Sequence, residues 1–242
     1  MRLREEQTWT MKVYVLQGDP DYHWLRPCEV ADWNWRGGVP IAFAWKEPSL
    51  QLADEDGSEF VGVDCFAMNT GADGPILGDY ARRALQQLIG AAGEFWPVRV
   101  LGHRYWWFNC LAQVDSLDPD ATEADWEAVS GEWGEFRWIT LPQRLAFRRE
   151  ALERAPAIFR VPQFPQGVLF VRDAFARAIS RQKLTGFKLD LVWSEEEGGV
   201  RDPAGFGLEG VFDERRPGEV ARKRARALAM LNERRIQASG DD

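Results

Sequence analysis

Residues 79–114 read DYARRALQQLIGAAGEFWPVRVLGHRYWWFNCLAQV and decide the fold class, because a helical pattern directly precedes a strand pattern. Asp79 can cap a first helical turn, since its carboxylate accepts hydrogen bonds from free backbone amides. Apolar residues then recur at helical spacing, at Leu85, Leu88, Ile89 and Ala92. We expect the helix to stop at Gly93, and two strands or one bent strand to fill residues 98–114.

Upstream of this stretch the sequence predicts short strands separated by an irregular segment. β-Branched and aromatic residues over 11–17 predict a strand, which Gly18 ends. Residues 18–40 place tryptophans among proline, glycine and aspartate, a pattern typical of a long loop. Further strands are expected at 39–45 and 60–68.

The segment that follows residue 114 combines turn and helix signals. Asp115, Asp118 and Asp120 have the spacing of calcium ligands, but the turn glycine and the closing glutamate of an EF-hand loop are missing. Turn formation is the better interpretation of these three residues. Thr122 with Asp125 resembles a capping box and predicts a short helix through Val129.

The remaining elements complete an α+β order rather than a strict alternation of strand and helix. Residues 136–147 look extended, Asp173 is expected to cap a helix over 173–182, and residues 186–193 alternate like a half-buried strand. We therefore expect a mixed, mostly antiparallel sheet packed with two or three helices, with the helices at 79–92 and 173–182 covering it.

Composition shifts suggest how the chain is divided. The expected parts are a flexible leader at 1–10, an α+β domain at 11–193 with a possible β-rich lobe at 11–74, an acidic glycine-rich linker at 194–213, and a basic C-terminal helical extension at 214–242.

Length and composition exclude several classes of protein. The 242 residues are 45% hydrophobic and 28% charged, which excludes a disordered or collagen-like chain. The formal net charge of −8 is opposite in sign to that of most nucleic-acid binders. Cys28, Cys65 and Cys110 are an odd number at wide spacing, so we expect buried thiols in a reducing cytosol rather than a disulfide framework. With no signal peptide and no apolar run long enough for a membrane, we expect a cytoplasmic protein without membrane contact.

Residues able to carry chemistry are few. The two histidines, His23 and His103, lie in no metal-ligand or hydrolase motif, so we expect no metal and no cofactor. A hydrolase that uses Cys110 or His103 with a carboxylate remains an alternative, because such partners need only meet in space. The run Tyr105–Phe108 could stack bases or sugars, but strand alternation turns two of its members inward and favours core packing.

Several short motifs occur in an order that resembles a known family. They are Pro75–Asp79, Pro97-Val98, Tyr105–Asn109, Val114–Asp118, Ile158–Arg160, Phe170–Asp173 and Leu184–Leu189. Their order and spacing over residues 75–193 resemble the polymorphic-toxin immunity family numbered eleven, a bacterial family formerly catalogued as a domain of unknown function. The first 74 residues match that family only loosely, and residues 194–242 extend beyond its usual end.

The resemblance implies binding rather than catalysis: a cognate protein toxin would be bound and blocked by covering its surface. An acidic inhibitor would associate quickly with a basic toxin such as a nuclease, because opposite charges steer the encounter. Exposed aromatics framed by carboxylates are the expected anchors, namely Trp33, Trp35, Asp54, Asp56, Glu195, Glu196 and Glu197. A second alternative is a nucleic-acid-binding regulator that uses Arg222–Arg226 of the basic segment. The sequence does not specify the oligomeric state.

Overall fold

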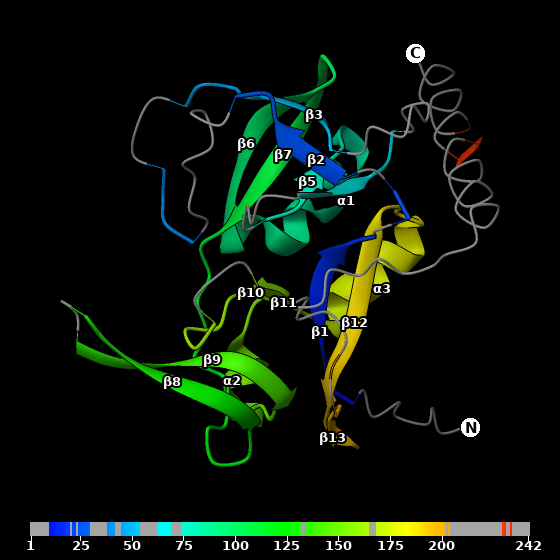
Figure 1. The fold of residues 1–242 in the computed structure, drawn as a ribbon. Coiled ribbons are helices and arrows are strands. Elements are labelled where there is room, and N and C mark those ends of the chain that lie inside the picture. The colour runs from blue at the N-terminus through cyan, green and yellow to red at the C-terminus, as the bar shows by residue number, and fades with distance from the viewer. Residues whose placement is uncertain are drawn as a thin grey trace, which may run out of the picture.

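The structure is a computed structural model that describes most of the chain between residues 10 and 203 and three residues near its C-terminal end. The described residues are 10–19, 21–22, 24–29, 38–41, 45–53, 62–68, 74–131, 134–164, 168–201, 203, 229–230 and 233. Figure 1 shows a barrel at the top, a twisted sheet below it, and a long hairpin that projects to the side.

A five-stranded antiparallel sheet forms the centre of the molecule. Its strand order is β10 (Ile158–Phe159), β11 (Leu169–Arg172), β1 (Lys12–Gly18), β12 (Phe187–Ser194) and β13 (Gly198–Gly199). The strand expected at 11–17 is therefore confirmed as β1, and it occupies the middle of the sheet. β1 pairs with β11 and β12, which lie more than 150 residues later in the sequence, so the central sheet forms only when these distant segments come together.

Apolar side chains cover both faces of this sheet. Helices α1 (Asp79–Ile89) and α3 (Asp173–Gln182) pack on one face through Leu85, Ile89 and Phe175. The opposite face packs against α2 (Arg149–Arg154) and the loop around Leu117, with contributions from Val13, Val15, Phe159 and Phe170. The prediction that the helices near 79–92 and 173–182 cover a sheet is confirmed, and α2 is a third helix.

Six short strands close into a barrel above the sheet. In barrel order they are β2 (Trp24–Pro27), β3 (Ser49–Leu52), β6 (Gly93–Val100), β7 (His103–Cys110), β5 (Ile76–Leu77) and β4 (Cys65–Met68). The pairs β2–β4 and β3–β6 are parallel and the others are antiparallel. Leu25, Leu50, Ile76, Val98 and Trp107 fill the interior.

A buried polar contact fastens the barrel to the sheet. Asp64, only 2% exposed, accepts hydrogen bonds from the backbone amide and the hydroxyl of Thr185, at 2.8 and 3.0 Å. Next to it, Gly186 has a φ of +81° and lies so close to Cys65 that a Cβ would stand 2.0 Å from that carbonyl oxygen. The Thr185-Gly186 pair therefore specifies how the turn before β12 meets β4.

The third sheet is a separate two-stranded hairpin of β8 (Glu123–Gly131) and β9 (Gly134–Arg144). The expectation of one sheet is thus wrong, since the described residues form three sheets within an α+β fold. The short helix expected from Thr122 to Val129 is also wrong. The Thr122 hydroxyl bonds to the backbone of Ala146 across the base of the hairpin, so it does not cap a helix.

Other local expectations need correction. Asp79 and Asp173 are the first residues of their helices rather than the caps, which are Gly78 and Arg172 without side-chain cap bonds. Both carboxylates still lie where the helix dipole favours negative charge. A short 3-10 turn, Gly90–Ala92, follows α1, and Gly93 already begins β6.

The strand boundaries also differ from expectation at the N-terminal side. The expected loop 18–40 contains β2. Of the expected strand 60–68, residues 65–68 form β4 and residues 62–64 are not in a strand, and the described residues of 39–45 are not in a strand either. The pattern of β12 is less regular than its sequence, since burial is concentrated at Val192, Trp193 and Ser194.

The described part of the expected acidic linker contains a strand. β13 lies inside residues 194–213 and pairs with β12. The helical extension at 214–242 falls outside the described residues except for Ala229, Met230 and Glu233, and the leader at 1–10 does so except for Thr10. The division of the chain into parts stays a prediction. No helix among the described residues is long and apolar enough to cross a membrane.

Candidate partner-binding surface

The aromatic run of β7 is core rather than a stacking platform. Tyr105, Trp107 and Phe108 are all buried. Tyr105 and Trp107 face the barrel interior, whereas Phe108 faces the helices. Three of the four aromatics are enclosed instead of the expected two, because both sides of β7 are covered by other elements.

Trp106 is the one member of that run that is not buried. Its ring already contacts side chains of the same protein. The guanidinium carbons of Arg82 and Arg104 lie 4.4 and 4.6 Å from its ring centroid. Its indole nitrogen donates to Asp79 at 2.6 Å. Cation–π contacts and a charged acceptor therefore satisfy this side chain locally, which leaves little for a stacked ligand.

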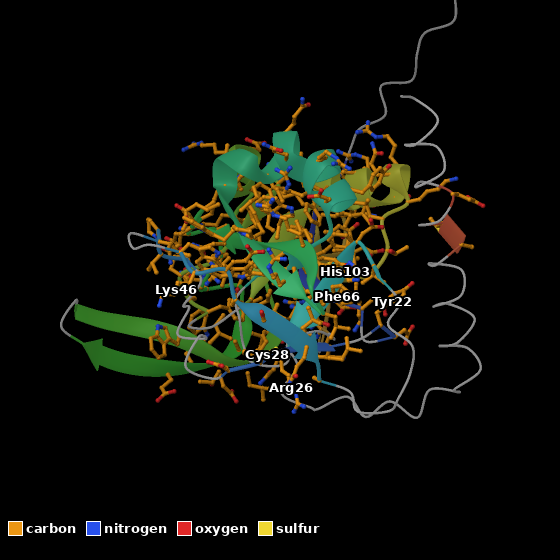
Figure 2. All side chains as sticks on the ribbon, turned by 90° about the horizontal axis from the view of Figure 1, so that it is seen from above. Tyr22, Arg26, Cys28, Lys46, Phe66 and His103 are labelled. Atoms are coloured by element: carbon orange, nitrogen blue, oxygen red, sulfur yellow. The ribbon has the colours of Figure 1, made fainter. Side chains whose placement is uncertain are left out.

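The Cys110 and His103 side chains cannot form one catalytic pair. They stand at opposite ends of β7, seven residues apart, which corresponds to about 23 Å of extended strand. Burial raises the pKa of the Cys110 thiol to about 11, so this group is protonated at neutral pH. His103 is exposed, and Figure 2 shows it with Cys28 and Phe66 on the barrel side of the molecule. All three cysteines are free thiols. Cys65 and Cys110 are buried, as expected, but that expectation is wrong for Cys28, which is exposed.

The aspartate cluster after β7 forms a turn, as expected. Asp118 accepts hydrogen bonds from the backbone amides of Asp120 and Ala121 at 3.0 and 3.2 Å. Asp115 accepts from Gln163 and pairs with Arg148, and these contacts lower the pKa of its carboxyl. Within the described residues, no group of three or more potential metal ligands comes together.

Of the seven residues expected to bind a partner, the structure describes three. Trp33, Trp35, Asp54 and Asp56 lie outside the described residues. Glu195, Glu196 and Glu197 form the turn between β12 and β13. There Glu195 accepts from Arg149 and from the Met11 amide, while Glu196 accepts from Thr10. Two of these three carboxylates thus hold the N-terminal strand and α2 in place.

Sequence reasoning missed a polar clamp on the chain segment that follows Trp33 and Trp35. Asn109, fully buried at the end of β7, accepts from the Gly38 amide at 2.9 Å and donates to the Val39 carbonyl at 2.8 Å. Glu94, opposite it on β6, accepts from the Trp96 indole at 3.0 Å. The signal was a polar residue among the apolar residues of the second half of β7, because such a residue must be hydrogen-bonded when buried.

The β8–β9 hairpin carries the exposed surface that best fits a binding role. Its register pairs Glu127 with Trp138 and Asp125 with Leu141. A bulge at Thr140, whose hydroxyl donates to the Asp125 carbonyl at 3.1 Å, puts Trp138 and Leu141 on one face although they are three residues apart. We call Asp125, Glu127, Trp138 and Leu141 the outer face of the hairpin.

The opposite face of the hairpin is anchored in the body. Ile139 is buried there and its amide donates to the Gln163 carbonyl at 2.9 Å. Ala124 and Trp126 pack against the same core, and Arg137 covers the Trp126 ring at 4.9 Å. Both figures show the far end of the hairpin projecting beyond the rest of the ribbon. The base is therefore fixed and the outer face points to solvent.

The segment that holds the hairpin also matches a known protein family. Residues 96–193 match the immunity protein family Imm11. This confirms, over those residues, the resemblance that the sequence motifs indicated. No curated protein matches the sequence.

The motifs behind the resemblance mostly hold the fold together. Thr185 and Gly186 join the sheet to the barrel, and Ile158 and Phe159 belong to the buried sheet. Asp118 shapes the turn before β8. The residues matched to Imm11 therefore include much of what holds the fold together, whereas β1 to β5 and α1 lie before the match. The outer face of the hairpin lies within the matched residues, whereas all seven residues expected from the sequence to contact a partner lie outside them.

Proposed function

We propose that this protein binds a cognate bacterial toxin in the cytoplasm and neutralises it by covering the toxin surface. The observation that carries the proposal is the match of residues 96–193 to an immunity protein family. An immunity protein of this kind acts as a stoichiometric binder and not as an enzyme. Covering a surface needs exposed, pre-organised contacts, and it needs no nucleophile or metal.

The geometry of the residues that could carry chemistry supports binding over hydrolysis. Cys110 is enclosed and protonated, and His103 lies at the other end of the same strand. A thiol nucleophile requires a thiolate that substrate can reach, and Cys110 has neither property. Within the described residues, the hydrolase alternative therefore finds no support at Cys110.

The acidic charge of the chain indicates what kind of toxin it would accept. A net charge of −8 favours fast association with a positively charged partner, and a nuclease domain is one such partner because it must attract phosphates. The residues Trp33, Trp35, Asp54, Asp56 and Glu195–Glu197 remain proposed contributors to that contact.

The direct test is co-expression with a candidate toxin, chosen as the C-terminal domain of any large secreted protein encoded next to this gene. We expect cells that make the toxin domain to survive only when this protein is also made, and the two purified proteins to form a stable complex. With a catalytically inactive toxin variant, the complex can be purified and its molecular mass measured, which gives the stoichiometry. Equal killing with and without this protein would refute the proposal.

A further inference from the structure

We infer that the β8–β9 hairpin is the element that docks the toxin, through its outer face and the open edge of β8, and that it accepts a basic protein surface. This inference rests on the proposed function and adds the location and chemistry of the contact.

The carboxylates of the outer face differ from their neighbours in being available. Glu123, at the base of β8, pairs with Arg144 at 3.0 Å and with Arg201 at 3.3 Å. Asp125 and Glu127, further along the same strand, are exposed, and no ion pair joins them to another described residue. Many other surface carboxylates are neutralised by the chain's own arginines, as Asp79, Asp115, Glu153 and Asp173 are. The charge at Asp125 and Glu127 is therefore free to meet an incoming cation.

Apolar side chains lie directly beside these carboxylates. Leu141 is 47% exposed, which makes it one of three large hydrophobic residues with substantial exposure among the described residues. Trp138, paired across the hairpin with Glu127, is half-buried. Tryptophan is enriched among the residues that dominate protein–protein binding energy, and a polar rim around an apolar centre is the usual anatomy of an interface.

The backbone of β8 offers a second type of contact. Among the described strands β8 pairs only with β9, so its other edge carries backbone groups that no strand occupies. An exposed edge can add a strand from a partner, and the backbone hydrogen bonds then supply affinity while the side chains supply specificity. The β9 edge is less available, because Ile139 bonds to Gln163 and Arg144 bridges to Arg201.

Charge selects the partner for this edge. If two copies of the chain paired through β8, Asp125 and Glu127 of one copy would face the same carboxylates of the other, and like charges directly across strands are destabilising. Acidic side chains on an edge strand are a known device against such self-association. A basic protein surface would instead be attracted to the carboxylates of Asp125 and Glu127. The same edge therefore disfavours a second copy of this chain and favours a basic toxin.

The test measures association of the full-length protein with the inactive toxin domain at low and at physiological ionic strength. We expect D125K/E127K to lower the association rate at least about tenfold at low ionic strength and to weaken its salt dependence. The matched pair for a single charge is E127K against E29K. Glu29 is also exposed and lies beyond β2 on the barrel, so both variants change the net charge equally. Only E127K should slow association strongly.

The possible outcomes separate the two proposals. If the wild-type protein binds and neutralises the toxin but D125K/E127K binds equally well, the hairpin is not the contact and the proposed function stands. If E29K and E127K slow association equally, only the overall charge matters and the inference is wrong. Sedimentation equilibrium of the wild-type protein tests for a dimer. If the wild-type protein is a dimer and D125K/E127K alters the dimerisation, the hairpin binds a second copy of this chain instead of the toxin, and the inference is wrong. If the wild-type protein does not bind the toxin domain, both proposals fail. Far-ultraviolet circular dichroism of each variant verifies that the substitution has not unfolded the protein.

Discussion

The two long hairpins of this protein both contain tryptophan and phenylalanine, but their environments are opposite. The β6–β7 hairpin places Trp107, Phe108 and Cys110 in complete burial between the barrel interior and the helices. The β8–β9 hairpin buries one face at its base and leaves Leu141 and Glu127 in solvent. Tryptophan content therefore does not distinguish a core strand from a binding strand.

The difference between the hairpins lies in what covers them. β7 has barrel strands on one side and α1 on the other, so its outward as well as its inward residues are enclosed. β8 has a partner strand and nothing beyond it among the described strands. A strand with one open edge and one open face is available to another protein, whereas a strand with neither can only stabilise its own fold.

The largest expected effect compares one tryptophan from each hairpin. Trp107→Ala should lower the free energy of unfolding by about 3–5 kcal/mol, because it leaves a cavity where the ring stacks 5.9 Å from Trp45. Trp138→Ala, in the outer face, should cost less than about 1 kcal/mol. Urea unfolding of both variants measures this, and equal losses would show that the two hairpins are buried alike.

Adding one methyl group at the contact between the barrel and the sheet should lower the stability of the protein. Gly186→Ala adds a Cβ that meets the Cys65 carbonyl oxygen at a left-handed φ, and we expect a loss of about 2–4 kcal/mol in unfolding free energy. Gly102→Ala is the matched control, since Gly102 has a φ of +82° but nothing within 4 Å of the added atom. It should cost only about 1 kcal/mol. Equal effects would mean that the close approach at Cys65 is unimportant.

A smaller loss is expected when the carboxylate at that contact is removed. Asp64→Ala leaves the Thr185 amide and hydroxyl without their acceptor in a buried place, which should cost about 1–3 kcal/mol. Asp64→Asn keeps an amide oxygen that can accept one of these hydrogen bonds, so it should restore part of the loss. Thermal and urea unfolding of the two variants give the comparison, and no difference between them would argue against the hydrogen bonds.

The smallest effect on stability should come from the outer face. Leu141→Lys replaces an exposed apolar side chain and should change the free energy of unfolding by less than about 0.5 kcal/mol. The same variant should dissociate faster from the toxin domain, because it removes apolar contact and adds a positive charge. Unfolding and dissociation are measured on one preparation. A large loss of stability would place Leu141 in the core and break the contrast between the hairpins.

The sequence alone was enough for elements whose signal is local. The apolar spacing around Leu85 and Ile89 predicts α1, and the β-branched run at 11–17 predicts β1, because helix and strand periodicities appear within a few residues. The family resemblance was readable for a similar reason, since turns such as Thr185-Gly186 need particular residues at particular positions.

Contacts between distant residues were decided only by the tertiary structure. Thr122 and Asp125 look like a helix start, yet pairing with residues 134–144 makes that segment a strand, because a full ladder of hydrogen bonds outweighs one local cap. The same holds for the binding surface: whether Trp107 or Trp138 faces solvent depends on which other elements cover the strand, and neighbouring letters in the sequence do not carry that information.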